Sequence, residues 1–86
     1  MKFRRKDPIR NRQIVVDAMQ LEENSLDGWP LGVYKDSDSV SGYAIDIDGL
    51  PHSIALGDWV VSVPDVGKYI FRQEIFMAKY EPCSHT

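Results

Sequence analysis

The chain has 86 residues, of which 43% are hydrophobic and 27% charged, and its formal net charge is −3. This length suits a single domain, residues 1–86, and leaves no room for a separate catalytic lobe. No apolar run approaches the roughly 18 residues of a membrane-spanning helix, and the N-terminus lacks the apolar stretch of a secretory signal. The one cysteine, Cys83, cannot form an internal disulfide. These features indicate a cytoplasmic protein in a reducing compartment.

The charge is distributed unevenly along the chain. Residues 1–12 contain six basic side chains and one acidic side chain, a net charge of +5, whereas residues 13–86 carry −8. The basic side chains are those of Lys2, Arg4, Arg5, Lys6, Arg10 and Arg12. This N-terminal arm could bind phosphate groups, or it could pack along the acidic body as an edge strand. Phe3 favours packing for residues 2–5, because it places an apolar anchor between the charges.

The first predicted strand covers residues 13–20. It begins with the β-branched run Ile14-Val15-Val16 and continues with alternating apolar and polar residues. The segment that follows is rich in acidic residues, glycine, proline and serine. We expect one short helical turn at 22–29 and a loop at 35–42.

Two hairpins are predicted beyond Gly42. The first turns at Asp48-Gly49, a dipeptide that favours a tight type I′ turn. The second turns at residues 64–67, and a turn at Gly57-Asp58 separates the two hairpins. The segment from Gln73 onward predicts a helical turn and then a short strand at 80–81. Residues 83–86 are expected to fray.

These elements predict a mainly β (α+β) fold. About five strands with short connections are typical of a small, strongly curved antiparallel sheet or barrel, here with one or two short helical turns. Large apolar side chains on the predicted strands and helical turn should form the core. The expected core residues are Ile45, Trp59, Val61, Tyr69 and Phe76.

The residue pattern contains no recognisable catalytic or metal-binding motif. Neither of the spacings typical of zinc ligands, Cys-x-x-Cys and His-x-x-x-His, occurs. Cys83 lies near the chain end, where a nucleophile would be poorly held. His52 alternates with apolar neighbours, which is typical of a half-buried structural histidine. We therefore expect no enzymatic activity, no cofactor and no metal.

Two groups of residues have both a structural and a functional interpretation. Asp46 and Asp48 share one face of a predicted strand and could contact a cation or a basic partner, although solvated strand acids explain them more simply. Trp59, Tyr69 and Phe71 lie on neighbouring predicted strands and could stack nucleic-acid bases. So small a domain needs large side chains for its core, so the core interpretation is favoured.

Both ends of the chain resemble a family of small, uncharacterised proteins of bacteriophages and prophages. The family pattern has a basic start, Val-x-Ala-x-Gln, Gly-Asp-Trp-Ile-Ile, a Gly-Glu-x-Tyr turn and Phe-x-x-x-Tyr-Glu. It corresponds here to Val16, Ala18, Gln20, Gly57, Asp58, Trp59, Val60, Val61, Gly67, Lys68, Tyr69, Phe76, Tyr80 and Glu81. The middle of the chain does not share the pattern. The resemblance implies a phage protein in the host cytoplasm, and it implies no catalytic activity.

Two functions are therefore expected. The first is a non-catalytic module that binds a host or phage protein, since an acidic body complements a basic partner surface. The alternative is nucleic-acid or nucleotide binding through the basic arm and the sheet aromatics. A membrane partner is not expected.

Overall fold

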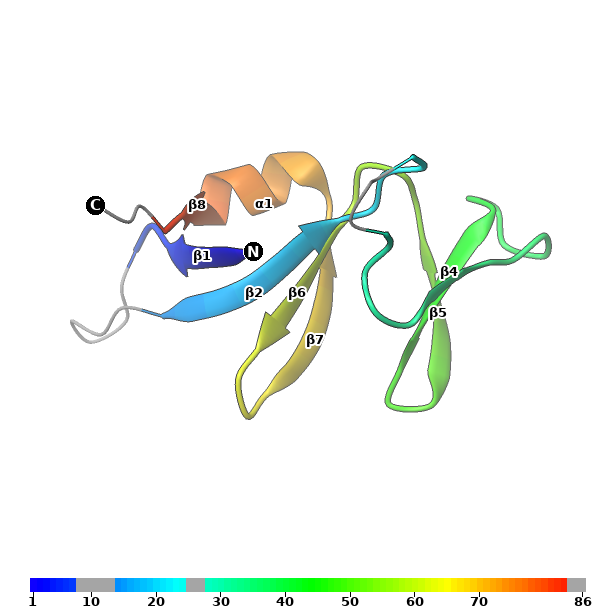
Figure 1. Cartoon of the computed structure of the whole chain (residues 1–86), viewed down its shortest axis with the longest axis horizontal. Helices are drawn as coiled ribbons and strands as arrows, with labels where there is room; N and C mark the ends of the chain where they lie inside the picture. Colours follow the sequence, from blue (N-terminus) through cyan, green and yellow to red (C-terminus); the bar gives the residue numbers. More distant parts are fainter. Residues whose placement is uncertain (8–13, 25–27, 84–86) are drawn as a thin grey trace.

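The computed structural model of the protein describes residues 1–7, 14–24 and 28–83 (Figure 1). Within these residues the chain forms eight strands and one helix. In chain order they are β1 (Lys2–Arg5), β2 (Val15–Gln20), β3 (Val33–Lys35), β4 (Tyr43–Ile47), β5 (Leu50–Ile54), β6 (Trp59–Val63), β7 (Gly67–Phe71), α1 (Gln73–Lys79) and β8 (Tyr80–Pro82). The prediction of a mainly β fold is confirmed.

The strands form two antiparallel sheets instead of one. The larger sheet has the order β7-β6-β2-β1-β8, and the smaller has the order β3-β4-β5. Both predicted hairpins are present, since β4 pairs with β5 around Asp48-Gly49 and β6 pairs with β7 around residues 64–66. The strand β3 was not predicted. Its three residues lie in a segment whose polar and glycine-rich composition indicated a turn and a loop.

The N-terminal arm is a strand over residues 2–5, as Phe3 suggested. It is an inner strand, because β1 pairs with β2 on one side and with β8 on the other. Phe3 is 3% exposed and faces the core, while Lys2 and Arg4 point to the opposite face and form ion pairs with Asp17 and Glu81. The remaining basic residues of the arm include Arg10 and Arg12, which lie outside the described residues.

The first hydrophobic core lies between the larger sheet and α1. Its buried members are Phe3, Val16, Ala18, Trp59, Val61, Phe76 and Tyr80. Phe76 is the buried residue of α1, and its ring contacts the rings of Phe3, Trp59 and Tyr80. A helix of seven residues has little stability of its own in water, so this one buried side chain holds α1 on the sheet.

The larger sheet is strongly curved. Its edge strands β7 and β8 are four strand spacings apart, which would be about 19 Å in a flat sheet. Nevertheless the rings of Phe71, at the end of β7, and Tyr80, at the start of β8, have centroids 6.1 Å apart. The helix α1 connects the same two strands across this face (Figure 1). The larger sheet is therefore strongly curved, as predicted, so that side chains of its two edge strands meet.

A second core joins the two sheets. Its buried members are Leu21, Tyr43, Ile45, Ile54 and Val60. Trp59 and Val61 face the first core and Val60 faces the second, so β6 is buried on both faces. A strand buried on both faces has a continuous apolar sequence, which explains the run Trp59-Val60-Val61.

The smaller sheet is an insertion between two neighbouring strands of the larger one. The backbone N–H of Leu21 donates to the carbonyl of Asp58, and the N–H of Gly57 donates to the carbonyl of Leu21. These bonds bring the two ends of the insertion together. The small sheet extends from one end of the molecule, which measures 43 × 26 × 20 Å (Figure 1). The radius of gyration is 13.5 Å, compared with about 12 Å for a compact domain of this length.

Two expectations about burial are wrong, and both concern edge strands. Tyr69 was expected in the core, but it is 45% exposed, because it lies on the edge strand β7 outside the cluster of side chains that α1 covers. His52 was expected to be half-buried, but it is exposed on β5, the edge of the small sheet. The β4–β5 hairpin extends beyond the second core, so Ile54, at the base of the hairpin, is the one buried residue of β5.

Candidate functional site

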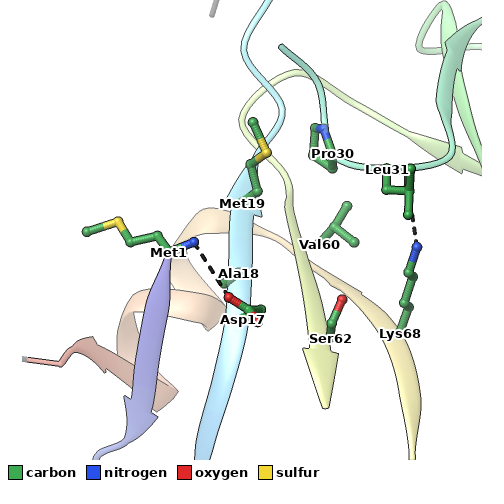
Figure 2. A pocket seen from close by; sticks show the side chains of 9 residues that line it. All are labelled: Met1, Asp17, Ala18, Met19, Pro30, Leu31, Val60, Ser62 and Lys68. Carbon is green, nitrogen blue, oxygen red and sulfur yellow. Dashed lines mark hydrogen bonds and ion pairs between the residues drawn. The ribbon is translucent and has the colours of Figure 1, made fainter. Parts of the chain in front are cut away.

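The candidate functional site is a groove on the face of the larger sheet that is opposite α1. We call it the sheet-face groove. Figure 2 shows it between β2, β6 and the segment that contains Pro30 and Leu31. Its volume is about 240 Å³. Six apolar residues line it, namely Met1, Ala18, Met19, Pro30, Leu31 and Val60, together with Asp17, Ser62 and Lys68.

The local structure explains why these side chains converge. In a strand successive side chains alternate between faces, so Ala18 and Val61 enter the first core while Met19 and Val60 point to the opposite face. Pro30 is buried against this second face. Leu31 follows it and is 81% exposed at the rim. The groove therefore lies on the same face of the larger sheet as the second core, at a place that the smaller sheet does not cover.

Opposite charges lie at the two sides of the sheet-face groove. Asp17 is 2.6 Å from the Lys2 ammonium and 3.7 Å from the Met1 amine. The hydrogen bond and charge of Lys2 and the charge of the amine lower the pKa of Asp17, against a smaller opposing effect of desolvation. On the other side, Lys68 Nζ donates to the carbonyl of Leu31 at 3.4 Å (Figure 2). This bond connects the Leu31 segment to β7.

A second, aromatic groove lies on the other face of the sheet, at the end of the first core that α1 leaves open. Its volume is about 260 Å³, and it is lined by Arg5, Ile14, Val63, Val66, Tyr69, Phe71 and Tyr80. It brings together one basic residue of the N-terminal arm and two of the aromatic residues that the sequence singled out. The third, Trp59, is buried in the first core.

The acidic residues singled out from the sequence do not form a site with the arm. Asp46 is exposed on β4, and Asp48 is exposed in the turn that follows it, so both belong to the small sheet whereas the arm belongs to the large one. Desolvation and the neighbouring carboxylates of Asp46 and Asp36 raise the pKa of Tyr34. Lys6 is exposed, and its backbone N–H donates to the carbonyl of Lys79.

A cluster of hydroxyl groups holds the loop before β4 against β5. Ser39 Oγ lies 3.1 Å from Ser41 Oγ and 2.9 Å from Ser53 Oγ, and Ser41 Oγ donates to the carbonyl of Ile54. His52 and Asp36 lie beside this cluster along a shallow pocket. Within the described residues, no hydrogen bond joins His52 to these serines.

The key residues of the sheet-face groove were not predicted from the sequence. Met19 and Leu31 are ordinary apolar residues in a strand and in a turn segment. Met19 lies opposite Val60 because β2 pairs with β6, and Leu31, from the insertion between these strands, lines the same groove and accepts a hydrogen bond from Lys68. The available sequence signal was the alternation in β2, which places Met19 on the face opposite Ala18.

Two further properties of the described residues bear on function. In residues 1–7, 14–24 and 28–83, no group of three or more His, Cys, Asp and Glu side chains is arranged to hold a metal ion. Over the same ranges, no helix has the length and hydrophobicity that crossing a membrane requires. In comparisons with known proteins, the chain matches no family model, no curated protein and no solved structure.

Proposed function

We propose that the protein is a non-catalytic protein-binding module whose partner inserts an apolar side chain into the sheet-face groove. The observation that carries the proposal is the combination of an exposed rim and a buried floor. Leu31 at the rim is 81% exposed, while Val60 on the floor of the groove is 5% exposed. Exposed apolar patches with polar rims are typical of interaction sites.

The composition of the groove also favours a protein ligand. Met19 contributes a flexible thioether side chain, which adapts to differently shaped apolar partners. Met1 lies at the rim with its amine toward Asp17 and its side chain directed away from Val60 (Figure 2). The polar groups at the rim, Asp17 and Lys68, lie on opposite sides and can orient a partner by charge. Residues 13–86 carry a net charge of −8, which favours a partner with a basic surface facing the body of the protein, whereas at the groove itself Asp17 is already paired with Lys2 and the Met1 amine.

The resemblance of both chain ends to phage and prophage proteins supports a partner from the phage or its bacterial host, in the cytoplasm of that host. The alternative of nucleic-acid binding through the arm and the sheet aromatics has less support. Trp59 is buried, and Lys2 and Arg4 are paired with carboxylates. These groups would have to leave their present contacts to bind phosphate or bases.

The test compares two leucine variants as bait. Leu31→Asp places a charge in the sheet-face groove, and Leu50→Asp places the same charge on β5 of the small sheet, where leucine is 64% exposed. The wild-type protein and each variant are immobilised and incubated with bacterial host lysate. Mass spectrometry then quantifies the proteins that each of them retains. A true partner is retained equally by wild type and Leu50→Asp, and at least about tenfold less by Leu31→Asp.

Both variants should melt within a few degrees of wild type, because both leucines are exposed. Equal retention of every specific protein by the two variants would contradict a docking role for this groove. Loss of retention by Leu50→Asp alone would move the docking site to the small sheet.

A further inference from the structure

We infer that the aromatic groove is a second binding site, which takes the free C-terminal carboxylate of a peptide that ends in a large apolar residue. The inference goes beyond the proposed function, because it concerns the opposite face of the sheet and a different set of residues.

The first step concerns Arg5. Along β1 the side chains of Lys2 and Arg4 point away from α1, whereas Phe3 and Arg5 point toward the first core. Arg5 is thus the one basic residue of β1 on the aromatic face. Its Nε is buried, and within the described residues it has no hydrogen-bond acceptor and no ion pair. A buried donor that lacks an acceptor is unfavourable, and Arg5 as a whole is half-buried and lines the groove, so a ligand carboxylate that engages the guanidinium would compensate for its missing partner.

The second step concerns the shape and polarity of the groove. Phe71 and Tyr80 form its inner wall, and Val63 lies beside them, partly buried against the first core. Tyr69 stands at the rim with 45% of its surface exposed. The guanidinium of Arg5 and two tyrosine hydroxyls are the polar side-chain groups of the described lining. This surface suits an apolar side chain next to one anionic group, because a carboxylate binds an arginine through charge-assisted hydrogen bonds.

The third step selects a peptide over a small molecule. Tyr69 and Phe71 belong to β7, which is an edge strand of the larger sheet. An edge strand presents unpaired backbone N–H and C=O groups, to which an extended peptide can add as a further strand. A peptide can therefore use the groove and the edge together, whereas a small carboxylate uses the groove alone. A nucleobase would need more polar groups along its edges than this lining supplies.

The experiment uses the full-length ¹⁵N-labelled protein and follows the Arg5 Nε–H resonance and the amides of β7 by NMR titration. The probe is the peptide N-acetyl-Gly-Leu-Phe with a free C-terminal acid, and the matched probe is the same peptide as its C-terminal amide. We expect the acid to shift the Arg5 Nε–H resonance and the β7 amides in a saturable way. The amide should bind at least about tenfold more weakly, because it lacks the anion.

Two arginine variants provide the matched control. Arg5→Gln keeps much of the side-chain stem and removes the charge inside the groove, so acid and amide should then bind equally weakly. Arg4→Gln removes the neighbouring charge on the opposite face and should preserve the preference for the acid. Tyr69→Ala, at a half-exposed position, should weaken both probes while the protein stays folded.

Several results would overturn the inference. The first is equal affinity of the wild type for the acid and the amide, and the second is an equal effect of Arg4→Gln and Arg5→Gln. The third is an affinity for 3-phenylpropanoate that equals the affinity for the peptide, since this result would make the groove a small-molecule site. Larger shifts of the same resonances with adenosine monophosphate would instead make it a nucleotide site. None of these results bears on the Leu31→Asp comparison, which concerns the other face of the sheet.

Discussion

The Trp59 indole lies flat on the Phe76 ring, with centroids 4.2 Å apart and planes inclined by 6°. This stack joins β6 to α1 at the centre of the first core. Trp59→Ala should therefore lower the free energy of unfolding by about 3 to 5 kcal/mol, since it leaves a cavity beneath the helix. Urea unfolding followed by circular dichroism measures the loss. A variant that melts within a few degrees of wild type would contradict the burial of Trp59.

Tyr69→Ala is the matched control for this prediction. Tyr69 pairs directly across from Val61 on the neighbouring strand, but it is half-exposed. Its removal should cost about 1 kcal/mol or less, because little packed volume is lost. If Tyr69→Ala destabilises the protein as much as Trp59→Ala does, the larger sheet is more closed than the structure indicates.

The ion pair of Asp17 predicts a specific dependence of stability on pH. The pKa of Asp17 is lowered from its ordinary value of 3.8, so the folded state binds this proton less readily than the unfolded state does. The pair therefore stabilises the fold above the ordinary pKa, and this contribution disappears as the pH falls through the lowered value. Asp17→Asn should melt below wild type at pH 6 and approach it near pH 2.

Salt provides the control for the Asp17 prediction. Both partners are largely exposed, so the difference between wild type and Asp17→Asn at pH 6 should shrink in 1 M NaCl. A difference that is the same at pH 2 and pH 6, or that does not respond to salt, would show that the substitution acts through packing and not through charge.

Gly32 allows a conformational effect to be separated from a steric one. Its φ is +92°, and a Cβ placed on it would lie 3.2 Å from the backbone oxygen of Asp46. Gly42 has a similar φ of +85°, but a Cβ there would have no atom within 4 Å. Gly42→Ala should cost about 1 to 2 kcal/mol for the left-handed backbone alone. Gly32→Ala should destabilise the protein more than Gly42→Ala does. If thermal denaturation shows equal destabilisation, the backbone near Asp46 moves away from the new Cβ without cost.

Deletion of residues 1–6 should lower the melting temperature strongly or abolish cooperative unfolding. The deletion removes Phe3 from the core and leaves β8 without a neighbouring strand. The double substitution Lys2→Gln and Arg4→Gln is the control, since it keeps the strand and removes two charges; its effect should be small because exposed ion pairs contribute little. An unchanged melting temperature after truncation would mean that β1 is dispensable.

The local elements of this fold could be predicted because their signals are local. Asp48-Gly49 specifies a tight turn whatever surrounds it, and Phe76 marks the helical segment through its spacing. The division into two sheets could not be predicted, because it depends on Gln20 pairing with Trp59 across the whole insertion. The error about Tyr69 has the same origin. Alternation assigns a residue to a face, but the side chains that cover this face decide how deeply it is buried: Tyr80 and Ile54 also lie on edge strands, yet both belong to the cores.

The candidate grooves were less predictable than the fold. The sequence directed attention to the arm and to Asp46, since clustered charges are conspicuous. The grooves instead form where β2, β6 and the Leu31 segment meet, and where Arg5 meets β7, and no sequence motif marks either junction. Arg5 was singled out as one of six arm cations, but its distinct position on the inner face follows from the register of β1 with β2 and β8.

The pairing of Phe3 with Pro82 places the two ends of the described chain in adjacent strands. During synthesis on the ribosome, β1 can pair with β2 early, but its other side stays empty until β8 has also emerged. The larger sheet is therefore completed only once β8 is available. A chain that lacks α1 and β8 would expose the outer edge of β1. It would also leave the place of Phe76 in the first core empty. Such fragments are suited to recognition by chaperones and proteases rather than to function, because contacts between distant parts of a chain form late in folding.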